Sequence, residues 1–282
     1  MTLFKFLSLQ TKYKQEVNAE RSKYIPGKFY PSHDVDSLPS VLNEYLKQCG
    51  FVINEQLTHC DIRWKYAYLK MAPDKKWLPI TCDQVNFIPE PARLALMKTK
   101  LFGLIPISAR DKFQSGKGNM LVKLLGLFTA TNATGPEIDA AELVTILAEA
   151  ILVPAYFFQP YITWEEMDRY SVKGTIAYKD IKASGIFYFN EHNEFLRFET
   201  EDRYYNNNGK FEKYKWSAYA WNYKTMNGFN QPLNFMAVWN MPNMDYNYFK
   251  GRVDKIKYNN TRIEEDSFPR EQQNVNLERD NQ

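Results

Sequence analysis

The sequence predicts an α+β protein: one long, curved antiparallel sheet, a half-barrel-like meander, with a helix packed in its concave face. Phe, Tyr and Trp make up 16% of the 282 residues, and these residue types favour strands. The second half of the chain consists largely of aromatic and β-branched runs joined by turns of hairpin length. Residues 139–153 stand apart as an amphipathic helix in the middle of the chain.

We expect three parts in the chain. Residues 1–34 form an N-terminal extension, residues 35–260 a single α+β domain, and residues 261–282 a disordered tail, since that tail is too polar to bury much surface. The apolar stretch near the start is far shorter than the ~20 residues of a membrane span. The chain should therefore contain no membrane span, with peripheral membrane contact left open. We expect a cytoplasmic location, or a membrane-associated one if the natural chain carries an upstream anchor.

The domain is predicted to begin with a helix of roughly three turns within residues 35–51, at the edge of the sheet. Its apolar residues recur at helical spacing, and Gly50 follows them as a stop signal. Strands are expected next at residues 60–69, 78–88, 92–98, 102–113 and 116–131. The last of these could be a helix by periodicity, but glycines begin it and turn residues end it, which favours a strand.

The helix at 139–153 has a predicted beginning, end and two distinct faces. Asp139 and Glu142 have the spacing of a capping box, and Pro154 supplies the stop. Leu, Ile and Ala side chains form an apolar face, while Glu142, Thr145 and Glu149 form a narrow polar stripe.

From Asp168 onward the chain is predicted to form a meander of antiparallel strands. The expected strands are residues 168–180, 183–190, 194–205, 213–225, 234–240 and 246–258. The strand at 213–225 has aromatic residues on both faces, so neither face should be fully solvated.

Charge and composition exclude several classes of function. With 36 basic and 33 acidic residues the net charge is only +3, which argues against nucleic acid as a partner. The three cysteines are too few for a disulfide framework and indicate a reducing compartment. The three histidines occur in separate contexts and no phosphate-loop, dinucleotide or zinc-protease motif is present, so we expect no metal and no cofactor.

The order of several motifs resembles an uncharacterised bacterial family known only as a domain of unknown function. The resemblance runs from about Val35 to Tyr258 and rests on LPSVLNEYL, ARDKF, GKGNMLVKLLGLF, GPEIDAAEL with LAEA, ITWEEMDRYSVKGT, FYFNEHNEF, KWSAY and YFKG. Lys215 and Phe249 depart from the family pattern, which has Pro and Trp there. The resemblance implies a strand-rich domain with a central acidic helix and brings no activity with it.

At the level of fold alone, a long antiparallel meander with a covering helix is also similar to the half-barrels of the Lol type, which carry lipoproteins or lipids. A fold does not fix a function, so the functional interpretation has to come from individual residues.

Glu149 is the central candidate, because a carboxylate on a helix that faces a concave sheet can act as a general base or anchor a ligand. Alternatively, it belongs to a solvated stripe or pairs with an arginine of the sheet. Arg110, with its neighbour Asp111, and Arg203 are the candidate partners, since an arginine fork holds a carboxylate well. Asp168 would be the second acid of a hydrolytic pair, or merely a turn residue.

Tryptophans are the candidates for the wall of an apolar cavity, although each could simply pack in the core. The predicted ligand-binding residues are Arg110, Glu149, Trp164, Asp168, Arg203, Trp216 and Trp239.

Three functions follow. The first is non-enzymatic binding of an apolar or lipid-like small molecule between the helix and the sheet. The second is a hydrolase or isomerase that uses Glu149 with Arg110 or Arg203 in the same cleft. The third is a structural scaffold whose helix fills the sheet.

Overall fold

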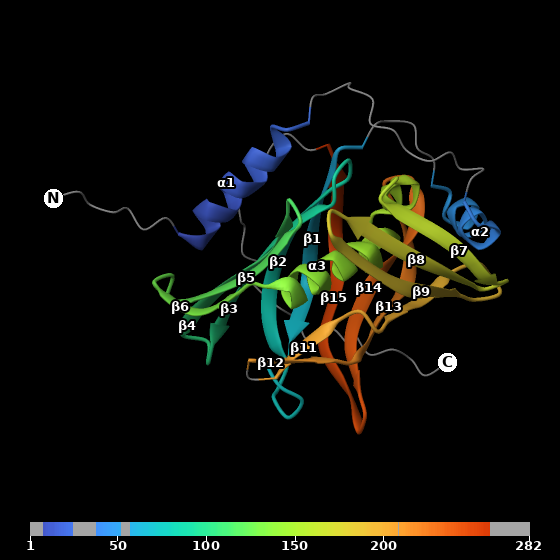
Figure 1. Cartoon of the computed structure of the whole chain (residues 1–282). Helices are drawn as coiled ribbons and strands as arrows, with labels where there is room; N and C mark the ends of the chain where they lie inside the picture. The colour runs from blue at the N-terminus through green and yellow to red at the C-terminus, as the bar shows by residue number, and fades with distance from the viewer. Residues whose placement is uncertain (1–7, 25–37, 52–56, 208, 260–282) are drawn as a thin grey trace.

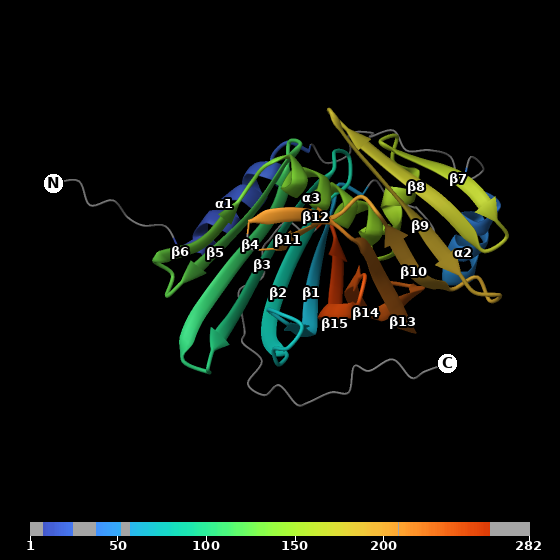
Figure 2. The same cartoon turned by 60° about the horizontal axis from the view of Figure 1, so that its bottom comes forward.

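In the computed structural model, which describes residues 8–24, 38–51, 57–207 and 209–259, one antiparallel sheet of 13 strands forms the body of the protein. The strands lie in the order β6-β5-β4-β3-β2-β1-β15-β14-β13-β10-β9-β8-β7. The sheet curves strongly but does not close (Figures 1 and 2). The predicted α+β class and curved antiparallel sheet are thus confirmed, whereas the predicted tail at 261–282 lies outside the described residues.

The chain builds this sheet from two runs of antiparallel strands that meet in the middle. The first run is β1 (His59–Leu69), β2 (Leu78–Phe87), β3 (Ala92–Leu101), β4 (Ile105–Gln114), β5 (Lys117–Leu124) and β6 (Phe128–Ala133). The second run is β7 (Ile162–Asp168), β8 (Ser171–Tyr178), β9 (Ile181–Phe189), β10 (Phe195–Thr200), β13 (Lys215–Met226), β14 (Phe229–Met241) and β15 (Met244–Tyr258). The last strand pairs with the first, with Cys60 opposite Tyr258, so β6 and β7 become the two edges.

Helix α3 (Pro136–Ala148) crosses the concave face because the chain must travel from one edge of the sheet to the other between β6 and β7. Two short 3₁₀ helices, Glu149–Ile151 and Pro154–Phe158, complete the crossing. The apolar side chains of α3, among them Leu143, Ile146 and Leu147, are fully buried. The predicted helix in the concave face is therefore confirmed (Figure 1).

The start of α3 differs from the predicted capping box. The helix begins at Pro136, three residues before Asp139, because Pro is well suited to the first turn of a helix. The carboxylate of Asp139 instead accepts a hydrogen bond of 2.7 Å from the backbone N–H of Gly118 in β5. A Cβ at Gly118 would lie 2.7 Å from the carbonyl oxygen of Ile138. Glycine at this position therefore lets α3 approach the sheet.

Helix α2 (Ser40–Cys49) closes one end of the main core. Tyr45 packs against Phe157 and Phe189, and Gly50 ends the helix with a φ of 68°, as its position in the sequence predicts. The first turn of α2 is tied to β7 by Glu166, whose carboxylate accepts hydrogen bonds from the backbone N–H and the hydroxyl of Ser40.

Helix α1 (Leu9–Arg21) lies on the opposite, convex face of the sheet, where the sequence predicted only an extension (Figure 2). Leu9, Tyr13 and Val17 form a second, smaller core with strand residues that include Val85 and Leu94. Side chains alternate between the two faces of a strand, so Val85 contacts α1 whereas its neighbour Gln84 faces α3.

Several predicted strand boundaries are wrong because turns were missed. The segment predicted as one strand at 116–131 is the hairpin of β5 and β6, with a turn at Leu125 and Gly126. The segment predicted at 194–205 contains β10 and then β11 (Tyr204–Asn207), which leaves the main sheet and pairs with β12 (Lys210–Lys213). This β11–β12 hairpin lies over the concave face, where β11 contacts α3 (Figures 1 and 2).

Candidate functional site

A cluster of buried polar side chains lies where the end of α3 meets β2, β3 and β4. Gln84 and Asn86 are two residues apart in β2 and share the concave face. Asn86 is paired with Arg93 in β3, which places the arginine beside them. Asp111 reaches the same face from β4. Antiparallel register thus gathers residues that are up to 27 positions apart in the sequence.

Glu149 accepts hydrogen bonds on both carboxylate oxygens from this cluster. Nε of Arg93 lies 2.9 Å from Oε1 and 3.1 Å from Oε2. Nε2 of Gln84 and Nδ2 of Asn86 donate to Oε2 over 2.9 and 2.7 Å. The predicted pairing of Glu149 with a sheet arginine is therefore found, but the arginine is Arg93, which the sequence did not single out.

Arg93 also binds a second acidic pair. Its Nη1 lies 2.8 Å from Oδ2 of Asp111 and 3.8 Å from Oε2 of Glu142 on α3. Burial alone would lower the pKa of Arg93, but Glu149, Asp111 and Glu142 outweigh burial and raise that pKa above its usual value. The guanidinium group therefore stays charged in the interior.

The environment of Glu142 in this cluster shifts the pKa of its carboxyl group. Burial, followed by the charge of Asp111, raises its pKa well above the usual value. Oε2 of Glu142 and Oδ1 of Asp111 are both buried, and neither has another hydrogen-bond partner among the described residues. A side-chain hydrogen bond to Asp111 contributes to the raised pKa of Glu142, and the charge of Arg93 opposes it.

Arg110 does not belong to this cluster, contrary to its proposed role as partner of Glu149. It precedes Asp111 in β4, and alternation along the strand therefore points the two side chains to opposite faces. Arg110 is buried under α1, where Nη1 donates to both carboxylate oxygens of Glu16 and Nη2 to Oδ1 of Asn119. It joins α1 to the convex face of the sheet.

Arg203 follows β10 in the chain and precedes the β11–β12 hairpin. Its side chain lies beside the last turn of α3, within an aromatic group on the concave face. Its guanidinium carbon is 4.4 Å from the ring centroid of Trp216 and 5.7 Å from that of Trp239. Nη1 donates to the hydroxyl of Thr145 over 2.7 Å. None of the described residues accepts a hydrogen bond from its buried Nε.

Tyrosines extend this aromatic group. Trp216 and Trp239 face each other across β13 and β14. The ring of Tyr205 in β11 lies 5.4 Å from that of Trp239, and the indole N–H of Trp216 donates to the hydroxyl of Tyr248 over 3.1 Å. We call Arg203, Trp216, Trp239, Tyr205 and Tyr248 the Arg203 site. The structure brings together three of the residues predicted from the sequence here.

Trp164 and Asp168 lie away from both groups. The indole N–H of Trp164 donates to the carbonyl oxygen of Phe157 over 3.0 Å, and its ring packs against Phe157 and Phe187. Asp168 is exposed at the end of β7 and accepts a hydrogen bond from the backbone N–H of Tyr170, which lowers the pKa of its carboxyl group. Asp168 therefore does not form an acid pair with the partly buried Glu149.

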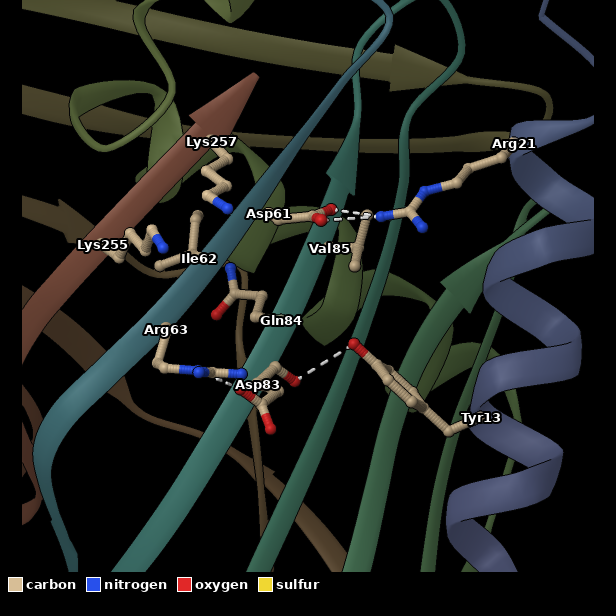
Figure 3. A pocket seen from close by; sticks show the side chains of 10 residues that line it. All are labelled: Tyr13, Arg21, Asp61, Ile62, Arg63, Asp83, Gln84, Val85, Lys255 and Lys257. Atoms are coloured by element: carbon tan, nitrogen blue, oxygen red, sulfur yellow. Dashed lines mark hydrogen bonds and ion pairs between the residues drawn. The ribbon is translucent and has the colours of Figure 1, made fainter. Parts of the chain in front are cut away.

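A small pocket of about 50 Å³ lies on the convex face beside α1 (Figure 3). Arg21 donates to both carboxylate oxygens of Asp61 over 2.6 and 2.7 Å, and Nε of Arg63 donates to Asp83 over 3.0 Å. The volume of this pocket is far below the ~300 Å³ at which small-molecule pockets begin. The pocket is therefore a gap between ion-paired side chains where α1 packs on the sheet, and it is too small for a lipid.

The remaining candidate chemistry is limited in the part of the chain that the structure describes. No group of three or more His, Cys, Asp and Glu side chains there is arranged to hold a metal ion. The three cysteines are free and buried, and burial raises the pKa of Cys49 to about 11. Within the same residues, no helix has both the length and the apolar character needed to cross a membrane.

Comparison with known proteins finds a matching family and solved structures that are similar to the chain. A family of unknown function, DUF6920, matches residues 36–258, which confirms the resemblance seen in the sequence. No curated protein matches the chain significantly. Solved structures similar to it include a LolA superfamily protein from Nitrosomonas europaea and a DUF1329 family protein from Desulfovibrio piger. Each is 8% identical with a TM-score of 0.43, and each comparison covers 79% of this chain and 94% of the other.

Proposed function

The chain belongs to the DUF6920 family, and we propose that it binds an amphipathic, lipid-like molecule at the Arg203 site. This proposal is based on the geometry of the chain's own residues. The site lies between the end of β10, the β11–β12 hairpin and the concave face of β13, β14 and β15. In this proposal the apolar part of the ligand packs on Trp216 and Trp239. Its polar end approaches the guanidinium group of Arg203.

The observation that carries the proposal is the unsatisfied Nε of Arg203 in an aromatic surrounding. Buried polar groups in proteins nearly always have a hydrogen-bond partner, and a buried N–H without one is costly. The Nε–H of Arg203 is buried beside two indole rings and has no acceptor among the described residues. A ligand oxygen would supply that acceptor.

The chemistry of the site favours a ligand with one anionic or strongly polar end. Arginine binds carboxylate and phosphate groups through a planar fork of donors, and indole rings supply a large apolar surface. Burial of an arginine with its anionic partner also strengthens the charge-assisted hydrogen bond between them, since the effective dielectric constant is low in the interior. Fatty acids and phospholipids combine both features.

The contacts of Glu149 argue against the enzymatic alternative. A general base must be free to reach the proton that it removes. Oε2 of Glu149 accepts hydrogen bonds from Arg93, Gln84 and Asn86, and Oε1 accepts one from Arg93, so three side chains of the sheet fix the carboxylate in place. These contacts support a structural role, in which Glu149 anchors the end of α3 to the sheet.

The packing of α3 favours a second candidate, a scaffold with a filled core. Leu143, Val144, Ile146 and Leu147 are fully buried between the helix and the sheet. Binding at the Arg203 site requires no displacement of these four side chains, because that site lies on the hairpin side of α3. A binding experiment separates the two candidates.

The test measures binding of a fluorescent fatty acid and of the corresponding fatty alcohol to the purified full chain. The wild type should bind the acid more tightly than the alcohol. Arg203→Gln should weaken binding of the acid on the order of tenfold, since a hydrogen bond to a charged group contributes about 1.5–3 kcal/mol, and should leave the alcohol nearly unchanged.

Arg197→Gln is the matched control. Arg197 also stacks on an aromatic ring, that of Tyr188, at 4.0 Å, but alternation with the core residue Phe198 puts it on the convex face. Failure of the wild type to bind either probe would favour the scaffold. Equal binding of the acid by the Arg203 and Arg197 variants would remove Arg203 from the site.

A further inference from the structure

Two adjacent hairpin turns at one end of the sheet expose a cluster of large apolar side chains. The β3–β4 turn carries Phe102, Leu104 and Ile105, and the β5–β6 turn carries Leu125, Leu127 and Phe128. Their exposed fractions are 84, 82, 39, 52, 60 and 63%, respectively. We call these six residues the apolar tips. Single exposed apolar residues are common on proteins, whereas a cluster of this kind marks an interaction surface.

The two turns lie side by side because β4 and β5 are neighbours in the sheet. Ile107 pairs with Leu124, and the backbone N–H of Leu125 donates to the carbonyl oxygen of Pro106 over 2.9 Å. Both turns lie at the left-hand end of the sheet in Figures 1 and 2. The six side chains therefore form one surface.

The two turns also share a sequence pattern. KLFGLI at residues 100–105 and KLLGLF at residues 123–128 both read Lys-Leu-apolar-Gly-Leu-apolar. In each, the third and fourth residues have positive φ angles, 52° and 73° at Phe102 and Gly103 and 54° and 70° at Leu125 and Gly126. The same local geometry thus presents the same kind of side chain twice.

The backbone conformation of these turns disfavours the residues that occupy them. Asn, Asp and Gly are the usual residues at positive φ in tight hairpin turns. The β13–β14 turn follows that preference, with Asn227 before Gly228 at φ angles of 54° and 84°. Phe102 and Leu125 are therefore unfavourable for the turn itself, and their apolar surface needs another explanation.

Charge around the apolar tips points to an anionic lipid surface. Lys100 and Lys123 each stand two residues before the residue of positive φ, and neither residues 97–109 nor residues 119–134 contain an Asp or Glu. Apolar side chains that enter the headgroup region next to lysines combine burial with attraction to anionic lipids. A groove of another protein would not require basic residues next to both turns.

We propose that the apolar tips dock this protein on the surface of a lipid bilayer, with the two turns inserted among the headgroups and Lys100 and Lys123 against anionic lipids. This docking does not depend on the Arg203 site, which lies on the concave face of the other half of the sheet. The two proposals can therefore fail separately.

Flotation of the full chain with vesicles tests the docking. We compare vesicles of phosphatidylcholine alone with vesicles that contain 30% phosphatidylglycerol. The wild type should float with the anionic vesicles, and Phe102→Ser, Leu104→Ser and Phe128→Ser combined should lower the partition coefficient at least tenfold. Met167→Ser, at an exposed position in β7 at the other edge of the sheet, should have no effect. Lys100→Gln with Lys123→Gln should lower binding about 25-fold, since each lysine contributes about fivefold.

A fluorophore at the tips provides a second readout. The three native cysteines are buried, so a nitrobenzoxadiazole label will react selectively with an added thiol in Leu104→Cys or Met167→Cys. Anionic vesicles should increase and blue-shift the emission from position 104 and leave position 167 unchanged.

Three outcomes would overturn the docking: no flotation of the wild type, equal flotation of the Ser triple variant, or an unchanged signal at position 104. A wild type that self-associates through the tips and ignores vesicles would assign them to a protein interface instead.

Discussion

Nε of Arg93 in β3 lies 2.9 Å from Oε1 and 3.1 Å from Oε2 of Glu149, the residue at which α3 ends. This ion pair fastens the end of the central helix to the sheet. The same guanidinium group also holds Asp111 of β4, so one side chain joins three elements. This contact links the end of α3 to two neighbouring strands.

Arg93→Ala should destabilise the protein by about 3–5 kcal/mol, because it leaves two carboxylates buried without their cation. Urea unfolding of the purified variant measures the loss. Arg63→Ala is the control, since its ion pair with Asp83 is partly exposed and should contribute no more than about 1 kcal/mol. Equal losses for the two variants would show that Arg93 is not the anchor of α3.

Glu142→Gln should stabilise the protein increasingly as the pH rises. The pKa of Glu142 is raised in the folded state, so the wild type loses stability as the pH rises above the unfolded value of about 4.3. Below that pH the wild type and the variant should be similar. Above it their difference should grow, up to about 1.4 kcal/mol per pH unit, until the folded pKa is reached.

Unfolding at a series of pH values from 4 to 8 measures this difference. Glu191→Gln, at a position that is 78% exposed, should show no such dependence. A Glu142 variant whose advantage stays constant across this range would mean that Glu142 is ionised in the folded protein.

Gly118→Ala should separate the start of α3 from β5. The added Cβ would lie 2.7 Å from a backbone carbonyl oxygen, which cannot move without the helix, and overpacking of this kind costs about 1–3 kcal/mol. The hydrogen bond between Gly118 and Asp139 should weaken as well. Thermal unfolding and amide exchange at Gly118 measure both effects.

Gly228→Ala is the control for Gly118→Ala, because it introduces backbone strain without steric overlap. Its φ is 84°, but an added Cβ there would meet no atom within 4 Å, so the variant should lose only about 1 kcal/mol. If amide protection at position 118 is unchanged in Gly118→Ala, a glycine there is not required for the close approach of α3 to β5.

The fold could be predicted from the sequence because strand and helix patterns are local. Aromatic and β-branched runs alternate with turns over most of the chain, and residues 139–153 have helical spacing. Helix α1 was missed although its signals are present: Ser8 caps the helix, and Leu9, Tyr13 and Val17 recur every four residues. Those residues are separated by Lys, Gln and Glu, which weakens the pattern.

The buried polar cluster could be predicted only in part, because it depends on strand register. Glu149 stands out on the predicted helix, but Arg93 becomes its partner only when Asn86 and Arg93 are paired. For Arg110 and Asp111, by contrast, the sequence alone could have shown that their side chains point to opposite faces of the sheet. Neighbours in a strand face opposite ways, so at most one of them could have reached the cluster.

The most direct test of the proposed function is photoaffinity labelling with a diazirine-bearing fatty acid, followed by peptide mapping of the labelled residues. Binding at the Arg203 site predicts labelled peptides that contain Trp216, Trp239 or residues 204–207, with labelling reduced in Arg203→Gln and retained in Arg197→Gln. Labelling confined to the turns at 102–105 and 125–128, or absent from the concave face, would contradict ligand binding there.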